Sequence, residues 1–161
     1  MFVIGIISDT HGGLPRGVYK AFKDCDHIIH AGDIGAPSVL YDLEMIAPVT
    51  AVLGNCDYDE FGPEVRGYAT KVFDGVRALV IHRPKDMRAA LAGQGLGALA
   101  AGDPLPRIAI HGHTHKPKKE YVGAVLTLCP GSPNYPRESA SSVMVLTLDA
   151  GKIVSADIIE L

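Results

Sequence analysis

The fold of this chain is decided close to its start by an apolar run that stops at an acid and an imidazole, Phe2-Val3-Ile4-Gly5-Ile6-Ile7-Ser8-Asp9-Thr10-His11-Gly12-Gly13. A short run rich in Ile and Val that ends in polar and glycine residues predicts a buried β-strand whose last side chains reach the edge of a sheet. Asp9 and His11 are two residues apart, so in an extended chain their side chains point the same way. The stretch therefore predicts a carboxylate oxygen and an imidazole nitrogen that face a common point.

The same pattern of an apolar run followed by polar residues recurs twice. The expected elements are strands over residues 27–30 and 48–53 and helices over residues 14–22 and 36–46. The second strand is followed by Asp33 and the third by Asn55. Alternating strands and helices predict parallel pairing through right-handed crossovers. The ends of the three strands then meet at one edge, which is where open α/β sheets bind ligands.

After residue 68 the pattern changes to antiparallel strands. Two apolar runs flank Asp74-Gly75, a two-residue turn signal that predicts a hairpin. A helix is expected over residues 86–99, weakened by glycines, and a strand over 106–110. A run of antiparallel strands follows, with a loop over 129–139; the strands are expected at 118–122, 124–128, 142–148 and 152–159. We predict a single domain over residues 1–161.

Composition and charge exclude several classes of protein. The chain has 161 residues, 47% of them hydrophobic, and a formal net charge of -3, so no basic surface predicts binding to nucleic acid or to an anionic membrane. Its three cysteines are odd in number and far apart, which favours a reduced, cytoplasmic setting over a disulfide framework. Asp9 interrupts the first apolar run, so we expect no signal peptide. No apolar run approaches the roughly 18 residues of a membrane span.

Polar side chains collect at the ends of the expected strands. A single histidine at such a place is most often structural, but four of them converging with two acids favour a site for divalent first-row metals. The absence of paired thiolates argues against a structural zinc site. The candidate ligands are Asp9, His11, Asp33, Asn55, His82, His113 and His115. They exceed the needs of one tetrahedral ion and suit two ions about 3.5 to 4 Å apart, which predicts metal-assisted hydrolysis of a phosphate ester.

Five ordered blocks of sequence resemble those of the calcineurin-like metallophosphoesterase superfamily, and more narrowly its short YfcE-type phosphodiesterases. The blocks are Asp9-x-His11, Gly32-Asp33, Gly54-Asn55-x-Asp57, His82 and Gly112-His113-Thr114-His115. The resemblance implies an α/β fold in which two mixed sheets form a β-sandwich flanked by helices. It also implies a dinuclear centre at one edge of the sandwich.

The resemblance assigns roles to individual positions. It implies that Asp9, His11 and His115 hold the first ion, that Asp33 bridges, and that Asn55, His82 and His113 complete the second ion. Asp33, Asn55 and His82 are the residues expected to act in catalysis. We favour manganese, although the same ligands accept iron, zinc, cobalt or nickel.

Four other polar residues near the strand ends are expected to have supporting or surface roles. Asp57 is expected to order its own loop. His30 and His111 are expected to lie in the core or behind the ligands, because metal-bound imidazoles need hydrogen-bonded partners. His27 is expected on the solvated surface.

Three positions depart from the family pattern or remain open. Cys56 occupies the place of a histidine that in many members contacts the phosphate, which leaves no evident general acid and favours esters with acidic leaving groups. Arg83-Pro84 stands where the family usually has glycine, so Arg83 either clamps a phosphate or crowds the second ion. Arg137 lies in a loop that resembles the Pro-Arg loop of the subgroup, where it either reaches the substrate or forms a surface ion pair.

The function favoured by these residues is a metal-dependent phosphodiesterase that hydrolyses a small or activated diester by a hydroxide bridging two metal ions. Its expected partner is a small phosphoester substrate, and self-association into a homo-oligomer is possible. Phosphomonoester or nucleotide pyrophosphate hydrolysis is the alternative within enzymes. A protein-binding scaffold of the Vps29 type, which shares this fold, is the alternative from another class, and the complete ligand set argues against it.

Overall fold

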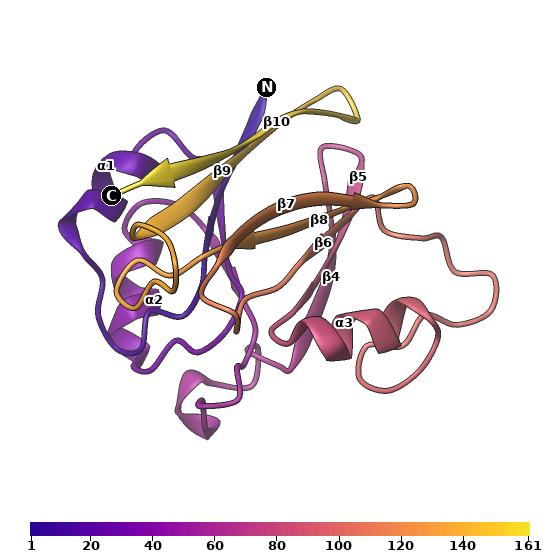
Figure 1. Cartoon of the computed structure of the whole chain (residues 1–161), viewed down its shortest axis with the longest axis horizontal. Coiled ribbons are helices and arrows are strands. Elements are labelled where there is room, and N and C mark those ends of the chain that lie inside the picture. The colour runs from indigo at the N-terminus through magenta and orange to yellow at the C-terminus, as the bar shows by residue number, and fades with distance from the viewer.

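A computed structural model describes all residues from 1 to 161 (Figure 1). Its elements are, in chain order, β1 (Phe2–Ile7), α1 (Arg16–Phe22), β2 (His27–His30), α2 (Pro37–Glu44), β3 (Val49–Ala51), a short 3-10 helix η1 (Asp59–Phe61), β4 (Tyr68–Phe73), β5 (Val76–Ile81), α3 (Pro84–Leu91), β6 (Ile108–Ile110), β7 (Pro117–Val122), β8 (Val125–Pro130), β9 (Ser142–Asp149) and β10 (Lys152–Glu160). None of the helices is both long and apolar enough to cross a bilayer.

The first sheet has the order β10-β9-β1-β2-β3. Its strands β1, β2 and β3 are parallel, as their alternation with helices predicts. The strands β9 and β10 come from the far end of the chain and extend this sheet in antiparallel fashion from β1. The alternating strands and helices that begin the sequence therefore supply three of the five strands of a mixed sheet.

The second sheet has the order β4-β5-β6-β8-β7. The predicted hairpin of β4 and β5 is confirmed, and both residues of its turn, Asp74 and Gly75, have positive φ. The antiparallel pairing predicted after residue 118 is confirmed for β7 with β8 and for β9 with β10, but the sequence did not predict how these pairs join the two sheets. The strand β8 pairs in parallel with β6, and β9 lies in the other sheet. The reason is that β7 takes the outer edge, so that β8 returns between β7 and β6.

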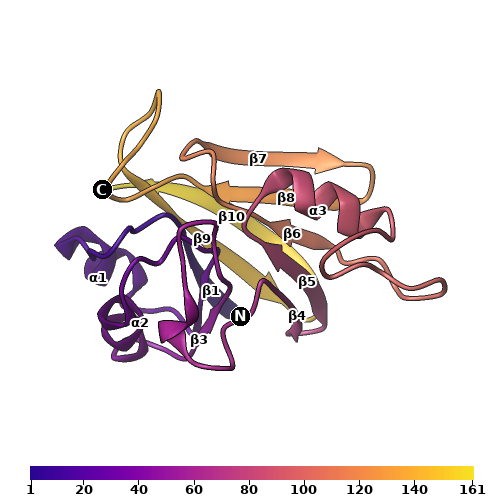
Figure 2. The same cartoon turned by 90° about the horizontal axis from the view of Figure 1, so that it is seen from below.

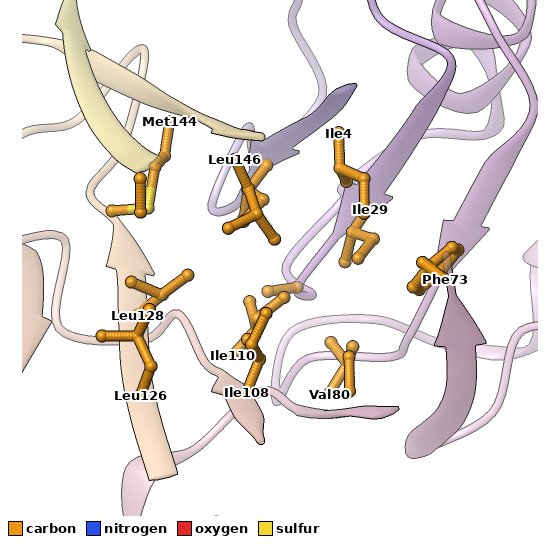
Figure 3. Packing of buried hydrophobic residues seen from close by; sticks show 14 of the residues in the cluster. Ile4, Ile29, Phe73, Val80, Ile108, Ile110, Leu126, Leu128, Met144 and Leu146 are labelled. Atoms are coloured by element: carbon orange, nitrogen blue, oxygen red, sulfur yellow. The ribbon is translucent and has the colours of Figure 1, made fainter. Parts of the chain in front are cut away.

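The two sheets face each other across the main core. Figure 3 shows side chains of β1, β2 and β9 pointing toward those of β6 and β8, all of them buried. A second apolar cluster lies between the first sheet and the helices α1 and α2, and a third lies between the second sheet and α3. Figure 2 shows α1 and α2 on one side of the molecule and α3 on the other. The predicted two-sheet sandwich flanked by helices is thus confirmed.

Several predicted boundaries are corrected. The helix α3 begins at Pro84 and ends at Leu91, well short of residue 99, because Gly93, Gly95 and Gly97 all take positive φ values that a helix cannot accommodate. Pro84 at its first position is favourable, since an N–H is not needed there. The strand β3 is shorter than predicted, and β8 continues into the expected loop as far as Pro130.

Candidate metal centre

The loops that follow β1 and β2 lie side by side and are joined through their backbones. Asp9 N–H donates to Gly32 O at 2.9 Å and His11 N–H donates to Asp33 O at 3.0 Å. The prediction that the chain stays extended past β1 is wrong, because Asp9 and His11 have φ values of 57° and 48°. Their side chains nevertheless face one point, since these left-handed turns fold both of them toward the same side of the loop.

Asp9 is fully buried, and its two carboxylate oxygens have different surroundings. Oδ2 accepts hydrogen bonds from the Ser8 hydroxyl at 2.7 Å and from His113 N–H at 3.0 Å. Oδ1 accepts none. It faces the Nε2 atoms of three imidazoles, at 3.2 Å from His115, 3.8 Å from His82 and 3.9 Å from His11.

Asp33 is arranged in the same way on the next strand end. Its Oδ1 accepts a hydrogen bond from Cys56 N–H at 2.9 Å. Its Oδ2 lies between two imidazoles, 3.4 Å from His82 Nε2 and 3.8 Å from His11 Nε2. Each carboxylate is thus held by one oxygen and presents the other to the histidines.

Two of the imidazoles are oriented by backbone carbonyls. His82 Nδ1 donates to Ala31 O at 2.7 Å, and His115 Nδ1 donates to Tyr135 O at 2.6 Å. Since a carbonyl can only accept, the proton of each neutral ring sits on Nδ1 and Nε2 keeps its lone pair. This arrangement is typical of metal-binding histidines, in which the second nitrogen is held by a partner behind the ring.

Asn55 and His113 lie on the outer side of the cluster. His113 Nδ1 is 2.9 Å from Asn55 Oδ1, and the His113 ring contacts the His82 ring edge-on with centroids 5.3 Å apart. Two atoms that each lie about 2.1 Å from one ion at a right angle are about 3 Å apart, so this spacing fits two neighbouring ligands of one cation. The structure thus brings all seven candidate ligands into one cluster at the edge of the sandwich.

The unsatisfied atoms of the cluster fit a divalent cation. Asp9 Oδ1, His11 Nε2 and His82 Nε2 are buried without a hydrogen-bond partner, although buried polar atoms are nearly always paired. Burial raises the pKa of Asp9 despite the opposing effects of His82, Ser8 and His115, so its ionised form is disfavoured when no cation is bound. These carboxylate oxygens and imidazole nitrogens face one another with unpaired lone pairs. Divalent first-row metals prefer this set of donors.

Asp33 and His82 are electrostatically coupled. Burial acts to raise the pKa of Asp33, but the nearby imidazole of His82 and the hydrogen bond from Cys56 N–H outweigh it and hold that pKa well below its ordinary value. Burial likewise acts to lower the pKa of His82, and the carboxylates of Asp33 and Asp9 outweigh it and raise that pKa. Asp33 is therefore ionised throughout the physiological range.

Comparison with known proteins agrees with this geometry. Residues 2–151 match the family model of the calcineurin-like phosphoesterase superfamily domain. The chain belongs to this superfamily. A probable metallophosphoesterase of Methanothermobacter thermautotrophicus is 36% identical over 161 residues, which cover 94% of this chain and 88% of that protein. Phosphodiesterase MJ0936 of Methanocaldococcus jannaschii is 30% identical over 138 residues, which cover 80% of this chain and 82% of that protein.

Solved structures share the fold of this calcineurin-like phosphoesterase. The phosphoesterase YfcE of E. coli aligns with a TM-score of 0.69 at 21% identity, over 97% of this chain and 98% of that one. A mutant Vps29 of Entamoeba histolytica aligns with a TM-score of 0.73 at 16% identity, over 99% of both chains. At these identities the likeness concerns the fold alone. Membership of the superfamily makes this chain a metal-dependent hydrolase, and its Asp and His residues are positioned to bind metal.

In this calcineurin-like phosphoesterase the residues expected to have supporting or surface roles can be compared with their observed positions. Asp57 orders its loop as predicted, since its carboxylate accepts from the N–H groups of Ile34, Gly35 and Gly54. His30 and His111 are buried, also as predicted. The surface position predicted for His27 is wrong: it is half-buried, packs on Phe73 at a centroid distance of 4.8 Å and bonds to Thr50.

The two arginines and the cysteine that depart from the family pattern lie around the centre. Arg83 is exposed and lines a small hollow with Asn55 and His82, and Arg137 lines a larger one with His11. Neither guanidinium has a carboxylate within ion-pair distance, so the ion pair considered for Arg137 does not form. Cys56 is exposed beside Asp33 and His11.

Sequence reasoning missed the residues that hold this metal centre from behind. Ser132 donates from its hydroxyl to Asp9 O at 2.8 Å, and the Asn134 side chain donates to Thr10 O and Gly13 O, each at 2.8 Å. Ser132 lies two residues after the end of β8. Nothing in the sequence places Asn134 against the loop after β1, because the two segments are more than 120 residues apart.

Proposed function

We propose that this protein is a phosphodiesterase that works with two divalent metal ions, manganese being the favoured metal, on a small or activated diester. The observation that carries the proposal is the position of Asp33 Oδ2 between His82 and His11, which belong to different halves of the cluster. A carboxylate oxygen shared in this way suits a bridge between two ions. The relative MJ0936, named a phosphodiesterase, supports the choice of a diester.

The chain offers two ligand groups that share Asp33. Asp9, His11 and His115 form the first, and their ligand atoms lie within 4.8 Å of one another. Asn55, His82 and His113 form the second. When bound, a pair of divalent ions lowers the pKa of a shared water and neutralises charge that grows on a phosphoryl oxygen. The residues themselves contribute position, because backbone N–H and C=O groups fix Asp9, Asp33, His82 and His115 before any ligand arrives.

Two arginine side chains beside the metal ligands carry positive charge that can contact the substrate. Arg83 stands beside Asn55 and His82, and Arg137 stands beside His11 and His115. Since neither forms an ion pair within the protein, both guanidinium groups are free to bind phosphoryl oxygens. We therefore assign Arg83 and Arg137 to substrate binding, one next to each ligand group.

Leaving-group protonation is the step for which this chain is poorly equipped. Slight desolvation and the nearby Asp33 carboxylate raise the pKa of the exposed Cys56 thiol, so it is a weak proton donor. Without an imidazole at this position, the departing alcohol must leave with little help. The enzyme should therefore prefer diesters whose leaving alcohol is acidic.

A metal-dependent assay tests the proposal. Metal-free protein is given Mn²⁺ or a chelator and assayed with bis-p-nitrophenyl phosphate and with the monoester p-nitrophenyl phosphate. We expect Mn²⁺-dependent release from the diester, faster than from the monoester. Asp33→Asn should lower the diester rate by at least 100-fold, roughly the loss of a mechanism-critical group, while Asp157→Asn on the exposed face of β10 serves as the matched control. Equal rates with Mn²⁺ and with chelator would refute the proposal.

The same assay, extended to a dinucleoside polyphosphate as a third substrate, separates the alternatives. A faster monoester reaction would favour phosphomonoesterase activity, and turnover of a dinucleoside polyphosphate would favour a pyrophosphatase. The two mutant Vps29 structures are 16% and 18% identical to this chain. A likeness at this level does not support a binding partner in common. A scaffold role would gain support if native mass spectrometry found no bound metal after titration with Mn²⁺.

A further inference from the structure

The metal centre is flanked by two hollows of unequal size. The smaller, of about 150 Å³, lies beside Asn55, His82 and Arg83. The larger, of about 580 Å³, is lined by His11, His115, Tyr135, Pro136 and Arg137. A diester has two arms, and only the larger hollow falls within the range of roughly 300 to 1,000 Å³ that small-molecule sites occupy. The structure thus offers room for one large arm, on the side of His11 and His115.

The wall of the larger hollow is built from a loop that is firmly attached to the metal centre. The loop follows β8 and reaches the site because β8 runs parallel to β6. Tyr135 N–H donates to Ser132 Oγ at 2.9 Å, Tyr135 O accepts from His115 Nδ1, and Arg137 N–H donates to His115 O at 3.2 Å. Tyr135 and Arg137 are therefore fixed relative to His115 through the backbone.

The side chains that this loop presents are chemically specific. Tyr135 is 54% exposed, and its ring meets the His11 ring edge-on, with centroids 5.4 Å apart. Neither its hydroxyl nor the Arg137 guanidinium has a hydrogen-bond partner within the protein. Glu138, the nearest acid along the chain, is instead paired with Lys116. An aromatic face and an uncompensated cation therefore stand together beside the metal ligands.

We propose that this hollow binds a nucleotide arm of the diester, with the base stacked on Tyr135 and a further phosphate held by Arg137. The inference rests on the proposed function and names its substrate class. Bases stack on aromatic side chains irrespective of sequence, and a guanidinium matches the oxygens of a phosphate. A diester arm that has an aromatic ring but no further phosphate would contact Tyr135 alone. The contributions of Tyr135 and Arg137 to binding can therefore be measured separately.

Three substrates with the same leaving group test the proposal. They are methyl p-nitrophenyl phosphate, thymidine 5′-(p-nitrophenyl phosphate) and its 3′-phosphorylated form. We expect wild-type kcat/KM to rise along this series. Tyr135→Ala should lower the ratio of kcat/KM for the thymidine ester to kcat/KM for the methyl ester by about tenfold. Tyr135→Phe should keep the wild-type ratio. Arg137→Ala should lower the gain from the 3′-phosphate by roughly fivefold. Tyr121→Ala, an exposed tyrosine on β7, is the matched control.

Failure of the nucleotide-binding proposal can be distinguished from failure of the proposed phosphodiesterase function. Metal-dependent hydrolysis of the methyl ester without any preference for thymidine, or a preference that survives Tyr135→Ala, would overturn the nucleotide arm alone. If no ester is hydrolysed, the proposed function fails, and calorimetric titration with thymidine 3′,5′-bisphosphate then decides on the hollow. Binding that weakens in both Tyr135→Ala and Arg137→Ala supports it, and binding that neither variant changes overturns it.

Discussion

His30 should make the stability of this protein fall as the pH is lowered from 7 to 5. The residue is fully buried, and its Nδ1 accepts a hydrogen bond from Gly32 N–H at 3.2 Å. The proton of the neutral ring is therefore on Nε2, which lies 2.9 Å from Thr10 Oγ1, while that hydroxyl donates to Ile34 O at 2.8 Å. Every position of the neutral ring is satisfied, so a second proton on Nδ1 would face the Gly32 N–H.

The size of the effect follows from the pKa. Burial lowers the pKa of His30 to about 3, with a further lowering by His82 and His11 and an opposing effect of Asp33. In the unfolded chain the pKa is about 6.5. Between these values only the unfolded state binds the proton, so the stabilisation is complete above about pH 6.5 and declines as the pH falls toward 3. From pH 7 to pH 5 the loss is about 2 kcal/mol.

Urea unfolding of the metal-free protein at pH 7 and pH 5 measures this loss, because a chelator removes the linkage between metal binding and protonation. His30→Asn is the informative variant, since its side-chain oxygen can still accept from Gly32 N–H but does not titrate. It should be less stable at pH 7 and lose about 2 kcal/mol less than wild type on going to pH 5. If both proteins lose the same free energy, His30 does not resist protonation and the reasoning is wrong.

Three further predictions concern the metal centre. Gly54→Ala should abolish Mn²⁺ binding in calorimetry, because a Cβ there would collide with Asp33. Asp57→Ala should lower the free energy of unfolding by roughly 2 to 4 kcal/mol, since it removes the acceptor of three backbone N–H groups; a smaller loss in urea unfolding would mean that water replaces it. Mn²⁺ should raise the melting temperature of wild type but not of Asp33→Asn, and equal shifts would place the bound metal elsewhere.

The parts of this fold that could be predicted from sequence depend on local signals. Each of the first three strands is an apolar run closed by polar residues, and the hairpin carries its own turn at Asp74-Gly75. Such signals require no knowledge of distant partners, because burial and turn geometry act over a few residues. The candidate ligands could be collected for the same reason, since each of them directly follows a strand or a short turn after one.

The parts that could not be predicted depend on contacts between distant segments. Ser132 holds Asp9 across 123 residues, and the position of Tyr135 depends on the parallel pairing of β8 with β6. His27 was expected in solvent because its neighbours along the chain say nothing of Phe73, against which it packs. Strand pairing and packing of this kind are decided by the whole fold rather than by local preference.

The backbone of the centre gives the strongest reason to regard its side chains as functional. Asp9, His11, Asp33, His113 and His115 all have φ between 48° and 70°, the left-handed region that disfavours residues with a Cβ. Asp and His adopt this region more readily than most residues with a Cβ, but each still does so at some steric cost. Glycine would adopt the same backbone shape without this cost. A protein that used the fold only as a binding scaffold would not need acids and imidazoles at these five positions, whereas the proposed metal site accounts for all of them.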